Sequence, residues 1–375
     1  MDMISSAGAT SSMPTSGFPD DDWKAAFQGL KVLITGHTGF KGSWLTAWLS
    51  LLGARLYGLA LPPDGPSLFA SARVEERIEG VFGDIRDAQV VNSVFAKVRP
   101  ELVFHLAAQS LVRRGYRNPV ATFDTNVMGT VNILEAVRQS PSVGAVVVVT
   151  SDKCYENDES GHALRETDPL GGREPYSASK ACAELVTSAY RSSFFAMPES
   201  PAIATARAGN VMGGGDWSED RLIPDIARAI IGGKQVVIRN PHAVRPWQHV
   251  LEPLRGYLTL GQRLLSLEPQ YAGAWNFGPS QESVVSVEDL VRMFIDVWGD
   301  GSFRVAPADS LAPEAVTLRL DSTKARDLLG YQPRINLPMA VDMTVSWYSK
   351  QARSSEVAAE LTDSQITGYM DLPSK

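Results

Sequence analysis

Cysteine is almost absent from this sequence, since the chain of 375 residues contains two, Cys154 and Cys182. Two cysteines are too few for a disulfide framework, which favours a protein of the reducing cytoplasm in which both are packing residues. They also lack metal-ligand spacing and a paired histidine, so no bound metal is predicted.

Long apolar runs and clusters of basic residues are missing as well. No stretch approaches the roughly 18 uninterrupted apolar residues of a membrane helix, so no membrane contact is predicted. Residues 1–22 have neither the apolar core nor the basic start of a signal peptide, and we expect a disordered tail there. The formal charge of −7, with no basic run, argues against general nucleic-acid binding.

The sequence does contain apolar material in short alternating segments. Its hydrophobic fraction of 44% is enough for a large core. Strand-like runs lie at 31–35, 55–61, 102–108, 145–151 and 202–211, and helical patterns lie at 42–53, 119–138 and 175–190. This alternation predicts an α/β fold, a doubly wound, Rossmann-like parallel sheet covered by helices on both faces. Ligands of such a sheet gather at the carboxyl ends of its strands.

The pattern loosens after about Gly213. Loops rich in glycine, proline and tryptophan alternate there with helical segments at 285–298 and 338–350. We therefore predict a first domain over 23–212 and a smaller substrate-binding lobe over 213–350, with some later strands and helices returning to the first domain. Residues 351–375 are expected to be a polar, frayed tail.

A glycine-rich loop, TGHTGFKG, directly follows the first predicted strand. Such a loop allows a tight turn and close backbone approach, and the helix after it points its positive end at a phosphate. The predicted dinucleotide contacts in this loop are Gly36, Thr38, Gly39, Phe40, Lys41 and Gly42. A glycine-rich turn that binds no ligand is the alternative.

The end of the second predicted strand does not decide between NAD and NADP. Ala60 and Leu61 stand where dinucleotide-binding folds commonly place a ribose-binding acid, and no arginine is present to bind a 2′-phosphate. Further along, Asp84 and Ile85 follow a strand and are placed to meet the adenine. Asp84 alone could instead cap a surface turn.

The sequence YSASK places Tyr176 and Lys180 four residues apart, on one face of a predicted helix. A phenol has an ordinary pKa of about 10, and a neighbouring ammonium is expected to lower the pKa of Tyr176 toward neutrality. Ser151, at the end of an apolar strand, could bond the same substrate hydroxyl. Tyr-x-x-x-Lys occurs often by chance. It supports a catalytic role here only because a strand that ends at Ser151 precedes it.

Five motifs in order, TGHTGFKG, HLAAQ, DTNVMGT, TSDKCY and YSASK, resemble the extended short-chain dehydrogenase/reductase family over about residues 31–348. The resemblance implies that Ser151, Tyr176 and Lys180 bind and deprotonate a substrate hydroxyl. It implies that Asn126 helps to hold the lysine and a water. It also implies cofactor contacts from His105, Leu106, Ala107, Ala108 and Gln109, with Gln109 and Ser151 touching the substrate too.

Asp152 and Lys153 point to the sugar-nucleotide 4,6-dehydratase branch of that family. There an Asp protonates the departing C6 hydroxyl, and the next residue, usually Glu, removes the C5 proton. Lysine at this place, with RAGNVMGGGDW and HAVRPWQHVLEPLRGY, is similar to the part of the branch that acts on CDP-glucose. Lys153 is then a neutral base, a charged group that stabilises the enolate, or a solvated surface lysine.

The resemblance therefore implies an NAD-containing lyase of the cytoplasm, active in deoxysugar or surface-polysaccharide synthesis. Its substrate would be CDP-D-glucose and its product CDP-4-dehydro-6-deoxy-D-glucose. Related enzymes pair through two helices each, which here are those near 119–138 and 175–190, so a homodimer or a dimer of dimers is expected. Rival hypotheses are a sugar-nucleotide 4-epimerase, another nucleotide-sugar 4,6-dehydratase, and a non-catalytic NAD(P)-sensing protein.

The substrate side is expected after the sixth strand, where the glycine-rich segment 209–217 suits backbone contact with phosphates. Family resemblance assigns the diphosphate to Asn210, and the planar fork of Arg245 could bind phosphate oxygens. Arg221 and Arg239 could do the same or could form surface salt bridges. The remaining candidates at the edge of this pocket are Asp216, Trp217 and Arg319.

Overall fold

The computed structural model describes residues 22–157, 159–266, 268–306 and 318–373. The predicted tail, up to residue 21, lies outside the described residues. In the part that the structure describes, no helix is both long and apolar enough to span a membrane.

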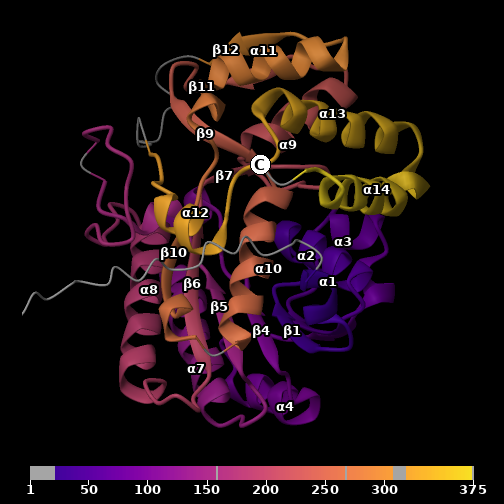
Figure 1. The fold of residues 1–375 in the computed structure, drawn as a ribbon. Helices are drawn as coiled ribbons and strands as arrows, with labels where there is room; N and C mark the ends of the chain where they lie inside the picture. Colours follow the sequence, from indigo (N-terminus) through magenta and orange to yellow (C-terminus); the bar gives the residue numbers. More distant parts are fainter. Residues whose placement is uncertain (1–21, 158, 267, 307–317, 374–375) are drawn as a thin grey trace, which may run out of the picture.

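A seven-stranded sheet, parallel throughout, forms the centre of the molecule (Figure 1). Its order is β10-β6-β5-β4-β1-β2-β3. From the neighbours β1 and β4, later strands are added outward in opposite directions across the sheet, as in a doubly wound fold. The strands are β1 Lys31–Thr35, β2 Arg55–Ala60, β3 Glu79–Phe82, β4 Leu102–His105, β5 Ala145–Val149, β6 Ala202–Ala208 and β10 Gly273–Phe277. The predicted fold class is confirmed.

Helices cover both faces of this sheet, and each face has its own core. One core contains apolar residues of α2, α10 and α1 together with the lobe, and the other contains residues of α4, α7 and α8. Because β1, β4 and β5 are almost completely buried, their sequences read as continuous apolar runs. The helices are α1 Asp22–Phe27, α2 Phe40–Leu51, α4 Ala88–Val98, α7 Gly129–Arg138, α8 Pro175–Phe194 and α10 Leu251–Leu265.

The predicted helix over 119–138 is interrupted. It consists of α6 (Pro119–Phe123), a π-helical turn over Asp124–Met128, and α7. π-Helical turns are frequent at functional sites because they redirect side chains. Asn126 lies in this turn and is buried.

A second group of elements lies beyond the carboxyl ends of the strands (Figure 1). Two small sheets, β11-β9-β7 and β12-β8, pack there with α9, α11 and α13. The elements are β7 Asn210–Met212, α9 Leu222–Ile231, β8 Val236–Ile238, β9 Val244–His249, β11 Val284–Ser286, α11 Val287–Trp298, β12 Phe303–Val305, α12 Thr323–Leu329 and α13 Leu337–Arg353. The predicted strand 202–211 is thus split at Gly209, since β7 leaves the main sheet to pair with β9. β10 returns to the main sheet from the predicted lobe, as expected for some later strands.

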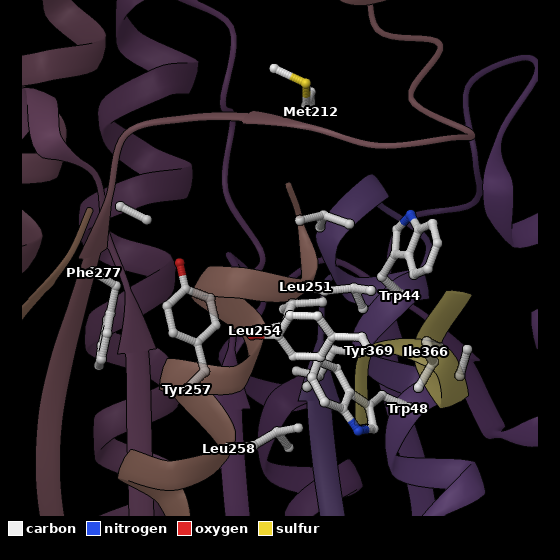
Figure 2. Packing of buried hydrophobic residues seen from close by; sticks show 14 of the residues in the cluster. Trp44, Trp48, Met212, Leu251, Leu254, Tyr257, Leu258, Phe277, Ile366 and Tyr369 are labelled. Carbon is white, nitrogen blue, oxygen red and sulfur yellow. The ribbon is translucent and has the colours of Figure 1, made fainter. Parts of the chain in front are cut away.

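The prediction of a frayed tail after residue 350 is wrong. α13 continues to Arg353, and α14 (Ala358–Met370) packs against the core with Ile366 and Tyr369 buried. Figure 2 shows Tyr369 beside Trp48 of α2, and the ring centroids lie 5.5 Å apart in an edge-to-face arrangement. The buried residues of α14 lie three or four positions apart and share one helical face, so a polar average composition concealed a buried stripe made of Ala358, Thr362, Ile366 and Tyr369.

Candidate active site

A large pocket lies where the carboxyl ends of β1, β2, β4, β5 and β6 meet the second group of elements. Most of the predicted site residues line it. In the cofactor half these are Gly36, Thr38, Gly39, Phe40, Lys41, Gly42, Asp84, Ile85, Leu106, Ala107 and Ala108. In the centre and the substrate half they are Ser151, Asp152, Lys153, Tyr176, Lys180, Asn210, Asp216, Arg221, Arg239 and Arg245.

The glycine-rich loop can pack against itself and against the end of β4 only because two of its positions lack side chains. Gly36 has a φ of +76°, and a Cβ there would lie 2.7 Å from the backbone nitrogen of Ala107. A Cβ on Gly42 would lie 2.1 Å from the carbonyl oxygen of Gly36. α2 begins after Gly39 without a side-chain cap, which leaves its positive end toward the pocket. This cradle fits the diphosphate of a dinucleotide.

The adenosine side of the cradle carries little charge. Ala60 and Leu61 line it, and Thr38 Oγ1 donates a hydrogen bond of 2.9 Å to the Leu61 carbonyl. The Asp84 carboxylate accepts from the Arg86 backbone at 2.9 Å and from its guanidinium at 2.6 Å, and these contacts lower the pKa of Asp84. Asp84 therefore stabilises a turn and also lines the pocket, and its predicted contact with the adenine stays a prediction.

The catalytic candidates come from the end of β5 and the first turns of α8. Ser151 precedes a short 3₁₀ turn, and its Oγ accepts from the Lys153 backbone at 3.2 Å and donates to Asp152 Oδ1 at 2.9 Å. The Glu174 carboxylate caps α8 by accepting from the Tyr176 backbone at 2.7 Å. Lys180 Nζ donates to the Val149 carbonyl at 3.2 Å. Strand end and helix start are thus held face to face.

The expected lowering of the Tyr176 pKa is not present in the protein alone. Burial raises the pKa of Tyr176 to about 12, and the opposing hydrogen bond with Ser151 and the charge of Arg221 do not offset it. Burial also lowers the pKa of Lys180 to about 8. The prediction is wrong because it neglected burial, which disfavours the charged form of both groups.

Asp152 has the surroundings of a protonated carboxyl group. Its side chain is 3% exposed, and its Oδ2 has no hydrogen-bond partner among the described residues. Burial raises its pKa, and the nearby positive charges of Lys153, Lys41 and Arg245 act in the opposite direction. A Cβ at Gly209 would lie 2.9 Å from Oδ2, so this glycine leaves the carboxyl group its space.

Lys41 reaches the catalytic centre although the sequence assigned it only to the cofactor. Its Nζ donates to the Tyr257 hydroxyl at 3.2 Å. Burial lowers its pKa to about 7, Arg221 and Lys180 act in the same direction, and Asp152 opposes them. Tyr257 lies on the buried helix α10, where nothing in the local sequence distinguishes it from a core aromatic residue.

Three predicted cofactor or substrate residues lie behind the pocket wall instead of lining it. His105 is held between the hydroxyls of Thr35 at 2.7 Å and Thr130 at 3.1 Å. The Asn126 side chain accepts from the backbone N–H of Gln109 and donates to its carbonyl. It also donates to Ser179 Oγ at 2.8 Å. Asn126 therefore fastens the 106–111 loop to α8, and its predicted contact with Lys180 is not seen.

The side chains of Gln109 and of one further candidate, Arg319, are bonded elsewhere. Gln109 donates to Thr122 at 3.0 Å and accepts from the Leu111 backbone at 2.7 Å. Arg319 donates to the Gly161 carbonyl at 2.8 Å. Neither lines the pocket, which corrects their predicted contact with substrate.

The substrate segment after β7 also differs from its prediction. The Trp217 ring packs edge-on against Tyr348, 5.1 Å between centroids, and does not line the pocket. A Cβ on Gly214 would collide with the Trp347 ring, and one on Gly215 with Leu68. These glycines therefore allow close helix packing, and a phosphate role for them is not supported.

Pocket residues that the sequence did not single out come from several segments, among them 110–113 at the start of α5 (Val112–Arg117), 218–220 and 222–225. Arg113 lines the pocket and pairs with Asp220 at 3.2 Å. The run VRRGYR after HLAAQS carries three arginines and was a usable signal. Asp220 had none, because its partners are distant in the chain.

Comparison with known proteins places this geometry among nucleotide-sugar enzymes. The chain is 46% identical over 356 residues to the CDP-glucose 4,6-dehydratase of Salmonella typhimurium, covering 92% of this chain and 98% of the relative. It is 28% identical over 336 residues to the dTDP-glucose 4,6-dehydratase of Streptomyces antibioticus, covering 85% and 92%.

Solved structures give the same picture. The dTDP-glucose 4,6-dehydratase DesIV of Streptomyces venezuelae, solved with NAD and TYD, is 25% identical with a TM-score of 0.72, covering 85% of this chain and 97% of its own. The Thermus thermophilus UDP-glucose 4-epimerase, solved with NAD, is 26% identical with a TM-score of 0.71, covering 85% and 98%.

A family match completes the comparison and confirms the predicted resemblance. Residues 33–344 match the family described as GDP-mannose 4,6 dehydratase, which is most of the chain. The relative at 46% identity extends over almost the whole of both proteins. The chain therefore belongs to the GDP-mannose 4,6-dehydratase family.

Proposed function

We propose that this protein is an NAD-dependent lyase that converts CDP-D-glucose to CDP-4-dehydro-6-deoxy-D-glucose for deoxysugar synthesis. The observation that carries the proposal is Asp152, a buried carboxyl group with a raised pKa, next to Ser151 at the end of β5. A dehydratase needs a proton donor for the leaving hydroxyl, whereas a simple 4-epimerase does not. The relative at 46% identity supports CDP-glucose as the substrate.

The proposed cofactor is NAD, held by the glycine-rich loop and the start of α2. Bound NAD would supply the transient oxidation at C4, the reduction at C6 and, in its oxidised form, a positive charge. Similar proteins solved with NAD support this choice. Ala60 and Leu61 by themselves select neither NAD nor NADP, because neither can bind the ribose hydroxyls or a 2′-phosphate with a charge.

Tyr176 is the proposed base for the C4 hydroxyl, and Ser151 is its partner in holding that oxygen. Both line the pocket, and hydrogen bonding with Ser151 lowers the pKa of the Tyr176 phenol against the effect of burial. A cation brought close to the phenol lowers this pKa further. Lys180, four residues along α8, also lines the pocket and has a pKa of about 8, so it can pass or accept a proton near neutral pH.

Asp152 is the proposed acid for the second half of the reaction. Once C4 is a ketone, the C5 proton is acidified, and loss of this proton with the C6 hydroxyl releases water. A protonated Asp152 gives its proton to that hydroxyl, which is the task of a general acid. Lys153 follows it in the chain and lines the pocket, either as the base that removes the C5 proton or as a cation that stabilises the enolate.

Turnover of a panel of sugar nucleotides tests this proposal. CDP-, dTDP-, GDP- and UDP-glucose are each incubated in D₂O with and without added NAD. Dehydration of CDP-glucose with solvent deuterium at C5 is the expected result, without net accumulation of reduced cofactor. A product that keeps its C6 hydroxyl would identify a 4-epimerase, as would be consistent with the similar epimerase fold. Tight dinucleotide binding without turnover would identify a sensing protein.

We further propose that the protein forms a homodimer through α6 and α8. These neighbouring helices carry exposed apolar side chains, including Val120 at 82% and Leu185 at 57% exposure. Phe123 and Phe194 are exposed on the same two helices. Light scattering should give twice the mass of one chain, and Leu185→Lys should shift the protein toward the monomer, because it places charge in the buried face.

The cytoplasm remains the proposed location. Cys154 and Cys182 are both free thiols in the structure, and Cys154 is buried. Free cysteines are common in reducing compartments. Fractionation of the producing cell is the direct measurement.

A further inference from the structure

The substrate half of the pocket contains one carboxylate shared by two arginines. Asp220 Oδ1 accepts from Arg113 Nη1 at 3.2 Å and from Arg239 Nη2 at 3.0 Å. All three side chains line the pocket. Arg113 belongs to α5 beside the main sheet, and Arg239 directly follows β8 in the second group of elements. One oxygen atom thus joins guanidinium groups from two elements that are distant in the chain.

The backbone at Asp220 is unusual for a residue with a side chain. Its φ is +58°, in the left-handed region that favours glycine. Of the described residues other than glycine with a positive φ, it is the one that lines the pocket. Strained conformations of this kind gather at ligand sites, where the side chain is required despite the backbone. Glycine would adopt this φ more easily, so we infer that the carboxylate of Asp220 contributes to the site.

Neighbouring contacts hold the same segment against α5 and the loop that precedes it. Glu219 accepts from Arg117 of α5 at 2.7 Å. Arg221 pairs with Asp216 at 3.3 Å and donates to Ser110 Oγ at 3.2 Å. The residues directly before and after Asp220 are therefore both held by contacts. Asp220 can then hold its two arginines in fixed positions.

The arrangement suits an anion with several oxygen atoms. A guanidinium has five N–H donors, so each arginine keeps donors for a phosphate after bonding Asp220. Without the carboxylate, two like charges would repel and two long side chains would regain rotamer freedom. The cofactor's diphosphate belongs at the glycine-rich loop in the other half of the pocket. The anion left for Arg113 and Arg239 is that of the substrate.

We propose that Asp220 is a positioning residue that holds Arg113 of α5 and Arg239 after β8 close together, to bind the diphosphate of the nucleotide-sugar substrate. This rests on the proposed function for the substrate class. Because the two arginines come from separate parts of the fold, diphosphate binding also ties α5 to the β8 side.

The test removes the charge of Asp220 and measures binding and turnover separately. For Asp220→Asn we expect the KM for CDP-glucose and the Kd for CDP to rise about tenfold, with kcat within about twofold, because diphosphate binding is lost and chemistry is not. Binding of cytidine, which lacks phosphate, and of NAD should stay within about twofold of the wild type. Arg113→Gln should match this, and adding Asp220→Asn to it should cost less than about twofold more, since the pair acts as one unit.

Asp363→Asn is the matched control. Asp363 pairs with Arg77 at 2.6 Å and joins distant segments as Asp220 does, but neither residue lines the pocket. Its KM and its Kd for CDP should equal those of the wild type. Thermal melting of Asp220→Asn and Asp363→Asn should show similar losses of stability, so that a difference in CDP binding does not come from unfolding.

Three results would overturn the proposal. The first is an unchanged Kd for CDP in Asp220→Asn. The second is tighter CDP binding, because the carboxylate would then compete with the diphosphate. The third is loss of NAD binding as well, because the effect would be general. Binding does not depend on turnover: if the wild type fails to dehydrate CDP-glucose, the proposed function falls, and titration with CDP, dTDP, UDP and GDP still tests Asp220. A wild type that binds none of them overturns the inference.

Discussion

Asp152 illustrates how one side chain acquires a chemical role from its surroundings. Its Oδ1 is held by Ser151, while Oδ2 has no protein partner among the described residues and faces the space that Gly209 leaves. A buried carboxyl group in this state favours its protonated form, because burial penalises the anion. The same residue in an exposed turn would be ionised at neutral pH and could not act as an acid.

Replacing Asp152 with Asn should separate the two halves of the reaction. We expect dehydration to slow by about 100-fold or more, the usual contribution of a general acid, while oxidation at C4 persists because Ser151 and Tyr176 are intact. Reduced nicotinamide should therefore accumulate, and its absorbance is the measurement. Asp363→Asn, remote from the pocket, should behave as the wild type. Normal product formation by Asp152→Asn would remove Asp152 from the mechanism.

At the scale of elements, a buried ion pair fastens α8 to β6 behind the catalytic residues. The Arg207 guanidinium pairs with Glu184 at 2.7 Å, and both side chains are 3% exposed. Glu184 also accepts from Thr150, the residue before Ser151, and Arg207 donates to Tyr155 at 2.6 Å. Removing one charge of such a pair leaves the other buried and uncompensated. This pair therefore fixes the relation between the helix of Tyr176 and the strand end.

Tyr369 attaches the C-terminal helix α14 to the rest of the molecule through both packing and a hydrogen bond. Tyr369 packs on Trp48 (Figure 2). It also donates to Glu252 Oε2 at 3.0 Å, and Glu252 accepts from the backbone of Ile335 at 2.6 Å. Tyr369→Ala should lower the free energy of unfolding by about 3–5 kcal/mol through the cavity it leaves.

Tyr369→Phe separates the hydrogen bond from the packing. It should cost about 1–2 kcal/mol, since a buried carboxylate loses one of its donors and keeps the others. Urea unfolding measures both values, and kcat should stay near that of the wild type because α14 does not line the pocket. Equal losses for the two variants would contradict the packing argument.

At the scale of the whole molecule, buried histidines make stability depend on pH. Burial lowers the pKa of His105 and of His249 to about 3, and that of His37 to about 4, from an ordinary value of 6.5. The unfolded chain then binds more protons than the folded one below pH 6.5. The stability from these neutral imidazoles is complete above about pH 6.5 and is lost as the pH falls toward the folded-state values.

Acidification should therefore destabilise the protein from about pH 6.5 downward, above the pH at which carboxylates of ordinary pKa are protonated. Each buried histidine is expected to remove about 1.4 kcal/mol of unfolding free energy per pH unit below pH 6.5. Urea unfolding at pH 7, 6 and 5 measures the slope, and His249→Gln should reduce it by the share of one group. A stability that is flat between pH 7 and 5 would contradict the neutral burial of these side chains.

Local patterns in the sequence were sufficient for the main sheet and for the core of the site. The apolar runs at 31–35 and 145–149 could only be buried parallel strands, and the glycine loop and the Tyr176–Lys180 spacing are each contained in a few residues. Segment 202–211 and the C-terminal segment were misread because their structure depends on partners. β7 leaves the sheet to pair with β9, and α14 packs on α2, and in both cases the partner is distant in the chain.

The sequence by itself therefore determined the fold class, the order along the chain of the strands that carry the motifs, and the placement of Ser151 at a strand end with Tyr176 and Lys180 on one face of a later helix. Only the tertiary structure decided the pKa of Tyr176, the place of Lys41 next to Tyr257, and the link from Arg113 through Asp220. The physical reason is the distance along the chain between the groups that interact. Periodicity and short motifs reflect neighbours along the chain, whereas burial and charge pairing depend on groups brought together from more than 100 residues apart, as Arg113 and Asp220 are.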